Sequence, residues 1–501
     1  ANSQLKNWLR QRSRWIKGYM QTYLVHMRHP LESLQKGRLY DLFSFQLVIG
    51  SGTGAIFINP LMWMLLVIYL AFGPSVINVY HVLFPGAILY LSAFCLIFGN
   101  FFYVYLYLLA CMRRKMYHLL PWALFMPCYW LLMSVAALYA LFELLVKPHY
   151  WQKTVHGLHL KRKNVSLVAA PLTMVDEPTM PVSVIPGKGS KAGAVLSVTM
   201  SLKAIPTLLM PAISPRQKQA QQIAKRARVR DLWLVATVVI ACIASIAACI
   251  YYFQQHQILL YGDAYSHMRI ARGILDSATP GLAQFGGVWL PLPHILMMPF
   301  VWDDYLWRTG LAGSFAAMPC YVLSAAYIYL SARLLTKNSL VSFLGTLVFI
   351  LNPNILYVRS TPLSEMVCVV TFTSACYYFL AWVYDDHTPH LIFAAAATFL
   401  ATLARYDGWF LFLAILVMTL IIGVIKKKSL VQIIANQILF GLLGGFGIAL
   451  WLIWNKIIFG DPLFFQHGPY SAQAQQIEFL HAHLLYPYHN LWVAIYSYSL
   501  D

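Results

Sequence analysis

The chain has 501 residues, of which 60% are hydrophobic and only 11% are charged, and its mean hydropathy is +0.63. Soluble domains are far less apolar, and repeated apolar stretches of about 18 residues or more predict membrane-spanning helices. The formal net charge of +19 can indicate nucleic-acid binding, but the basic residues lie mainly between the apolar stretches, where the positive-inside rule accounts for them. We therefore expect a protein embedded in a lipid bilayer, with no nucleic-acid partner.

The first 40 residues are basic and aromatic, as in a helix that lies on a membrane surface. Candidate spans follow at about 42–58, 60–73, 82–111 and 119–146. The first two meet at Asn59-Pro60 and form either a hairpin or one broken helix. Four spans keep both ends of this block cytosolic but leave Arg113-Arg114-Lys115 outside, against the positive-inside rule. Three spans repair this and place Lys161-Arg162-Lys163 outside instead, and we prefer four.

Residues 158–230 are less hydrophobic, are punctuated by prolines and end in the basic run 225–230. This composition predicts a cytosolic linker or a small domain. The fold class we expect is an all-α polytopic membrane protein, in which this segment joins two transmembrane helical modules, 1–157 and 231–501.

The second hydrophobic block predicts seven spans, at about 231–254, 311–335, 339–357, 363–384, 391–404, 409–425 and 431–459. A long polar and aromatic stretch, 255–310, separates the first two, and within it 290–302 predicts a re-entrant or interfacial helix. With 225–230 in the cytosol, Lys426-Lys427-Lys428 returns to the cytosol as the rule requires. Asp263, Glu365 and Arg405 then all lie on the extracytoplasmic face, which indicates a shared site there.

Near the N-terminus, Gln11-Arg12-Ser13-Arg14-Trp15 offers an apolar ring face and hydrogen-bonding groups that suit a sugar. An aromatic and basic interfacial helix is the alternative. The run resembles the QxxRW motif of processive, cellulose-synthase-type glycosyltransferases, and 147–157 resembles the exit sequence of that family. The resemblance implies that Gln11, Arg14 and Trp15 bind substrate, and that a nucleotide-sugar domain precedes Ala1. We therefore expect a fragment, cut at both ends.

Residues 261–302 and the later polar loops resemble the GT-C class of glycosyltransferases, especially its protein-mannosyltransferase and aminoarabinose-transferase-like members. The resemblance implies a GT-C-like second module and a polyprenyl-phosphate sugar donor. It also implies an acidic residue in the first extracytoplasmic loop, which Asp263 matches by position. The acceptor would be an extracytoplasmic glycan, lipid or protein.

Asp263 is the residue that we expect to act as general base, or to position a divalent cation (Mg²⁺ or Mn²⁺). A helix N-cap is its structural alternative. His267 lies four residues later on the same helical face, where it can pair with Asp263, share a metal with it or be merely structural. Arg269 and Arg272 are expected to hold the lipid phosphate or to anchor at lipid headgroups.

Trp289 lies in a Gly- and Pro-rich stretch and is expected to stack on a sugar, unless the stretch is only a membrane re-entry turn. Glu365 follows a Pro-Leu-Ser run that resembles a GT-C element with a catalytic acid, although a carboxylate there also suits the helix dipole. Arg405 and Asp407 resemble the Arg-Tyr/Pro-acid-Gly turn of the same class. Arg405 is expected to bind phosphate, and Asp407 to pair with it.

The sequence thus predicts an integral-membrane glycosyltransferase of the hexosyltransferase type, in a prokaryotic cytoplasmic (inner) membrane. A polytopic transporter or lipid-linked sugar flippase is the alternative, because intramembrane charges fit that class too. The clustering of charges at one face rather than at the midplane favours the enzyme. A non-catalytic scaffold is the third reading.

Overall fold

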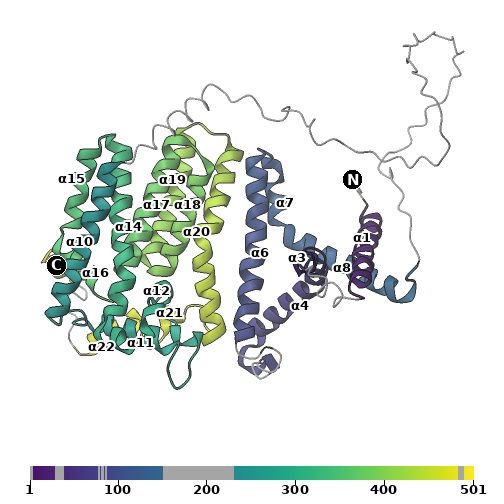
Figure 1. Cartoon of the computed structure of the whole chain (residues 1–501), viewed down its shortest axis with the longest axis horizontal. Helices are drawn as coiled ribbons and strands as arrows, with labels where there is room; N and C mark the ends of the chain where they lie inside the picture. Colours follow the sequence, from purple (N-terminus) through teal and green to yellow (C-terminus); the bar gives the residue numbers. More distant parts are fainter. Residues whose placement is uncertain are drawn as a thin grey trace, which may run out of the picture. The chain divides into compact units, whose positions relative to one another are not determined.

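The computed structural model describes residues 4–28, 39–76, 79–80, 84, 87–149, 231–482 and 490–500. Within these residues every regular element is helical (Figure 1). Eight of the described helices are long and apolar enough to cross a membrane, or nine spans result if one bent pair makes a single span. The described chain is therefore an all-α polytopic membrane protein, as predicted. The expected linker at 158–230 lies outside the described residues.

The first block contains one amphipathic helix and three candidate spans. Its elements are α1 (Leu5–His26), α3 (Leu39–Phe45), the π-helix η1 (Gln46–Gly50), α4 (Ser51–Phe72), the 3-10 helix η2 (Gly73–Val76), α6 (Ala87–Arg113), η3 (Tyr117–Leu119), α7 (Leu120–Leu124) and α8 (Met126–Val146). The helical stretch Leu39–Phe72 is continuous, so the two segments expected at 42–58 and 60–73 are one span. With three crossings, Arg113-Arg114-Lys115 and Lys161-Arg162-Lys163 lie on opposite sides of the membrane, so the positive-inside rule cannot hold for both, and the sidedness of this block stays a prediction.

Pro60 lies inside α4 without ending it. Proline has no N–H, so the carbonyl of Ile56 loses its usual helical partner. Ser134 of α8 supplies a replacement, because its hydroxyl donates to Ile56 O at 2.6 Å. Asn59 and Asn100 of α6 exchange amide hydrogen bonds of 3.0 and 3.1 Å beside it. In an apolar environment such internal partners are what allow a proline-containing helix to continue.

The described part of the second block contains five candidate spans, a bent helix pair that makes a sixth, the shorter apolar helix at the span expected at 391–404, and a layer of short helices. Its elements are α10 (Leu232–Gln254), α11 (Gly262–Gly273), η4 (Leu282–Phe285), α12 (Leu292–Val301), α13 (Asp304–Thr309), α14 (Leu311–Thr336), α15 (Ser339–Ile350), α16 (Pro353–Ser360), α17 (Glu365–Asp385), α18 (Thr388–Ala404), α19 (Asp407–Ile425), α20 (Leu430–Phe459), α21 (Phe464–His467), α22 (Ala472–His481) and α23 (Leu491–Leu500). The third expected span is the pair α15 and α16, bent by 61°. Asn352 caps α16 at this bend, and Pro353 begins it. The expected interfacial segment 290–302 is α12.

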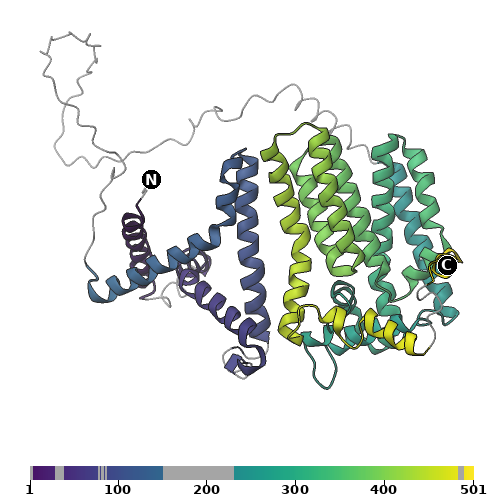
Figure 2. The same ribbon diagram turned by 180° about the vertical axis from the view of Figure 1, so that it is seen from behind.

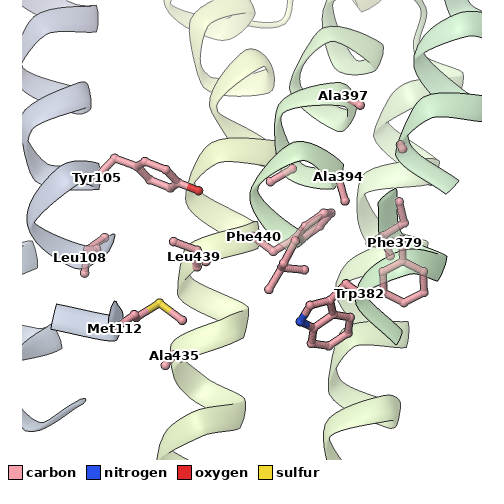
Figure 3. Packing of buried hydrophobic residues seen from close by; sticks show 14 of the residues in the cluster. Tyr105, Leu108, Met112, Phe379, Trp382, Ala394, Ala397, Ala435, Leu439 and Phe440 are labelled. Atoms are coloured by element: carbon pink, nitrogen blue, oxygen red, sulfur yellow. The ribbon is translucent and has the colours of Figure 1, made fainter. Parts of the chain in front are cut away.

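The main core forms where α18 packs between α17 and α20. Its contact face is built of alanines, which let the helices approach closely. Phe440 of α20 and Trp382 of α17 fill the space around Ala394 (Figure 3). Tyr105 of α6 belongs to the same cluster, so both hydrophobic blocks contribute to one core.

Side-chain contacts define the two ends of the second block. At one end Tyr329 donates to the carboxylate of Asp231, and Lys428 pairs with Asp386. At the other end the start of α17, the α18–α19 turn and the end of α20 meet the α11–α12 region, which Figures 1 and 2 show below the long helices. The polar loops that the sequence placed on one face therefore share one end of the bundle.

Candidate active site

Asp263 lies in the first turn of α11, at the end of the bundle where the polar loops meet. Tyr261 occupies the N-cap position and provides no side-chain hydrogen bond. Asp263 is therefore not the N-cap of this helix, which excludes that alternative. Its carboxylate is exposed and has no hydrogen-bond or ion-pair partner among the described residues. The helix dipole favours a negative charge at this position.

His267 is buried one turn further along α11, and it pairs with His294 rather than with Asp263. Its Nδ1 lies 2.8 Å from Nε2 of His294, a fully buried residue near the start of α12. The ring of Trp289 stacks on His267, with 4.3 Å between centroids and 26° between planes. The Asp263–His267 pair that the spacing allowed is thus replaced by a triad of two imidazoles and an indole.

Burial keeps both imidazoles neutral. It lowers the pKa of His267 to about 4, and the positive charge of Arg405 adds to the effect. Burial also lowers the pKa of His294 to about 3, with His267 contributing. The hydrogen bond from Tyr406 to the carbonyl of Val288 places the α18–α19 turn beside the residue that precedes Trp289. At neutral pH the pair therefore shares one hydrogen bond without carrying charge.

Arg405 is held by three side chains at the starts of α17 and α19. Its Nε donates to Asp407 at 2.9 Å, and its Nη1 donates to Glu365 at 2.8 Å and to Ser364 at 3.1 Å. The expected pairing of Arg405 with Asp407 is confirmed. Within the described residues Nη2 has no partner, and the second oxygen of Glu365 is buried without one. Arg405 thus has a fixed orientation and keeps two N–H donors for a ligand.

The loop that contains Trp289 is hydrogen-bonded to the α18–α19 turn and to α20. Tyr406 donates to the carbonyl of Val288 at 2.6 Å and accepts from the Trp451 indole at 3.1 Å, while the Trp454 indole donates to Gly286 O at 3.0 Å. A Cβ at Gly287 would lie within 2.7 Å of three side chains, so only glycine allows this close approach. These contacts hold the backbone on the N-terminal side of Trp289 in place, and with it the indole that stacks on His267.

Comparison with protein-family models and with curated proteins finds no match to this chain. The resemblances named above therefore rest on their motifs alone.

Arg272 is engaged within the fold. It pairs with Asp276 at 2.8 Å and Asp304 at 2.7 Å, and it donates to the carbonyls of Val301 and Trp302. It thus ties α11 to the end of α12 and to α13. Arg269 is exposed, and its guanidinium lies 5.9 Å from the Tyr265 ring centre. Of the two arginines expected to bind phosphate, only Arg269 is available without breaking ion pairs.

The N-terminal signature lies on α1, which packs on α8. Ile16 is buried against the alanines of α8, and the ammonium group of Lys17 donates to the carbonyl of Lys147 at 2.7 Å, capping the end of that helix. Trp15 is 46% exposed, with the Arg12 guanidinium 4.6 Å from its ring centre. Gln11 and Arg14 belong to the same helix. The exposed ring of Trp15 suits the predicted contact with a sugar.

The described side chains do not assemble a cation site. No group of three or more His, Cys, Asp or Glu residues in the described part of the chain is placed to hold a metal ion. Glu365 and Asp407 both bind Arg405, and Nδ1 of His267, the residue expected to share a metal with Asp263, is hydrogen-bonded to His294. The Mg²⁺ or Mn²⁺ that Asp263 was expected to position stays a prediction, and we derive no step through it.

His294, Tyr406, Trp451 and Trp454 are the site residues that sequence reasoning missed. His294 closes the Pro-Leu-Pro-His run after Trp289, and nothing in that run marks it as a partner of His267. The two tryptophans recur three residues apart near the end of α20, a spacing that places them on one helical face. That spacing was the only sequence signal for them.

Proposed function

We propose that the protein is a membrane glycosyltransferase of GT-C type, which transfers a sugar from a polyprenyl-phosphate donor to an extracytoplasmic acceptor hydroxyl. One observation carries the proposal: the carboxylate of Asp263, which has no partner among the described residues, stands one turn before the His267–His294–Trp289 triad, and the turn that holds the oriented Arg405 is hydrogen-bonded to the loop of Trp289. The motif resemblance to GT-C enzymes supports the class. The position of these groups at one end of the bundle, rather than at its middle, favours an enzyme over a transporter.

In the proposed step the acceptor oxygen attacks the anomeric carbon of the donor sugar. The new bond joins that oxygen to the anomeric carbon, and the bond from the anomeric carbon to the phosphate oxygen breaks. The acceptor proton passes to Asp263, which acts as general base. Polyprenyl phosphate leaves with the electron pair, and the Nη2 donors of Arg405 stabilise its developing charge.

Two further roles follow from the contacts. Glu365 is bound to Arg405, so we assign it the orientation of that guanidinium instead of proton transfer. Trp289 stacks on His267 with one ring face, and we assign its other face to the donor sugar. The α1 helix with Trp15 would belong to a second, nucleotide-sugar-dependent module, as the QxxRW resemblance implies.

The test replaces Asp263 by Asn, which keeps its shape and removes its basicity. Membranes that contain the full-length protein receive radiolabelled polyprenyl-phosphate hexose, and transfer of label to the acceptor fraction is measured. General-base catalysis contributes about 100-fold or more, and we expect a loss of that size. Asp461→Asn is the matched control, because Asp461 lies at the same end of the bundle and its contact to the Leu463 N–H survives the change.

Unchanged transfer in Asp263→Asn would contradict the assignment. If neither wild type nor Asp263→Asn transfers label while labelled lipid crosses the membrane, the protein would be a flippase and not a glycosyltransferase.

A further inference from the structure

A cavity of about 430 Å³ lies along α11. Such a volume falls within the range of about 300–1,000 Å³ that small-molecule sites occupy. No role proposed so far uses it as a pocket. It is lined by Ser266, Arg269, Gly273, Ser277, Gln284 and Trp307, among others.

The cavity and the triad lie on two adjoining faces of one helix. His267, Met268 and Ala271 form the buried face of α11, whereas Ser266, Ile270 and Gly273 face the cavity. Helical geometry places Asp263 on the border between these faces, and Ser266 follows it by about 4.5 Å along the axis. The triad therefore lies on one side of Asp263, and a ligand in the cavity would approach Asp263 from the other side.

The charges around the cavity balance. Arg269, Arg272 and Asp276 belong to the lining, and Asp304, which lies outside the lining, pairs with Arg272 as Asp276 does. A phosphate dianion gains little from Arg272, whose charge two carboxylates already compensate, and Asp276 in the lining repels it. A neutral ligand that carries many hydroxyl groups suits this wall better.

The remaining lining matches such a ligand. Trp307 offers an aromatic ring. The guanidinium of Arg272 lies 5.3 Å from the centre of that ring and helps to fix its position. Gln284 donates to the carbonyl and the hydroxyl of Thr279, which fixes its amide and leaves Oε1 as an acceptor. Ser266 and Ser277 add hydroxyls. An aromatic platform surrounded by fixed donors and acceptors is the chemistry that recognises a saccharide.

We propose that this cavity binds the saccharide portion of the acceptor and delivers its hydroxyl to Asp263. The inference rests on the proposed glycosyl transfer, because it identifies the acceptor of that reaction as a glycan or glycolipid. Gly273 contributes space, since a side chain there would project toward Gln284. The donor would bind on the triad side of α11 and the acceptor on the cavity side.

The test measures binding without turnover. Purified full-length protein in lipid nanodiscs is mixed with methyl glycosides of common hexoses and pentoses, and saturation-transfer NMR reports contact. Ser277→Trp fills the cavity, whereas Ala278→Trp adds the same bulk at the next, exposed residue outside the lining. We expect at least one glycoside to bind wild type and Ala278→Trp, and Ser277→Trp to weaken that binding by about tenfold or more.

Three results would overturn the inference. These are no glycoside contact in wild type, equal binding by Ser277→Trp, and full displacement of the glycoside by inorganic phosphate, which would indicate an anion site. Because binding needs no catalysis, Asp263→Asn should still bind the glycoside. The binding assay thus distinguishes a failure of the proposed glycosyl transfer from a failure of the proposed saccharide binding in the cavity.

Discussion

At the residue scale, His267 and His294 are the pair on which the site's geometry depends. Each imidazole is buried, and the 2.8 Å hydrogen bond between them orients the ring on which Trp289 stacks. His267 follows from the sequence, because it lies one turn after a candidate carboxylate. Its partner does not, since the two histidines are 27 residues apart and only the packing of α12 on α11 brings them together.

Replacement of His294 tests this pair. His294→Leu leaves Nδ1 of His267 buried without a partner, a situation that costs about 1–3 kcal/mol. His294→Gln places an amide nitrogen near the position of Nε2 and should lose less. Unfolding of the two variants in detergent, followed by circular dichroism, checks the order. Equal stability of both variants and wild type would show that the hydrogen bond contributes nothing.

The same pair predicts a pH dependence of stability. The folded-state pKa values, about 4 and about 3, lie below the ordinary 6.5, so the unfolded chain binds more protons between these limits. Stability should therefore fall as the pH drops from 6.5 toward 4, by up to about 1.4 kcal/mol per pH unit for each histidine. His294→Gln removes one titrating group and should show a shallower slope in thermal unfolding. A flat wild-type profile would contradict the burial of neutral histidines.

At the element scale, Gly408 explains the tight turn that presents Arg405. A Cβ at this position would collide with the backbone carbonyl of Ala401, because α19 starts directly against the end of α18. The sequence predicted the turn by resemblance but gave no reason for its glycine. That reason lies in helix packing, which residue patterns do not encode.

Gly408→Ala should therefore displace α19 and the Arg405 cluster. The atom in the way belongs to the backbone of Ala401, which cannot move aside as a flexible side chain can. We therefore expect the unfolding free energy to fall by about 3 kcal/mol and transfer activity to be lost. Gly345→Ala in α15 is the control, since a Cβ there meets nothing within 4 Å and alanine favours a helix. Thermal unfolding of both variants in nanodiscs gives the comparison. Equal melting temperatures would rule out the predicted collision.

The single helix over Leu39–Phe72 was the element that sequence reasoning resolved least well. Asn59-Pro60 predicts a hairpin or a broken helix, because proline removes one hydrogen bond from a helix. Ser134, 78 residues away, repairs that loss, and no local pattern could have revealed it. Five of the seven spans predicted for the second block are helices long and apolar enough to cross a membrane, since their long apolar runs leave little ambiguity, whereas a sixth is the bent pair α15–α16 and the span expected at 391–404 is the shorter apolar helix α18.

At the scale of the whole molecule, charge and hydropathy predicted which loops share one end of the second block. The contacts of Arg405, Tyr406 and Trp454 bear this out. The side of the membrane on which that end lies stays a prediction from the positive-inside rule. The division of α11 into a triad face and a cavity face could not be predicted, because it requires the positions of α12 and Trp307.

The most direct test of the account is an experimental structure of the full chain with a non-reactive polyprenyl-phosphate sugar analogue. We predict its phosphate at Nη2 of Arg405, its sugar on Trp289, and room for one hydroxyl oxygen between the anomeric carbon and Asp263. Reacting atoms should then lie about 3–3.5 Å apart once an acceptor binds. A donor headgroup bound elsewhere, such as beside Trp15 or in the cavity of about 800 Å³ between α4, α6 and α8, would contradict the proposed site.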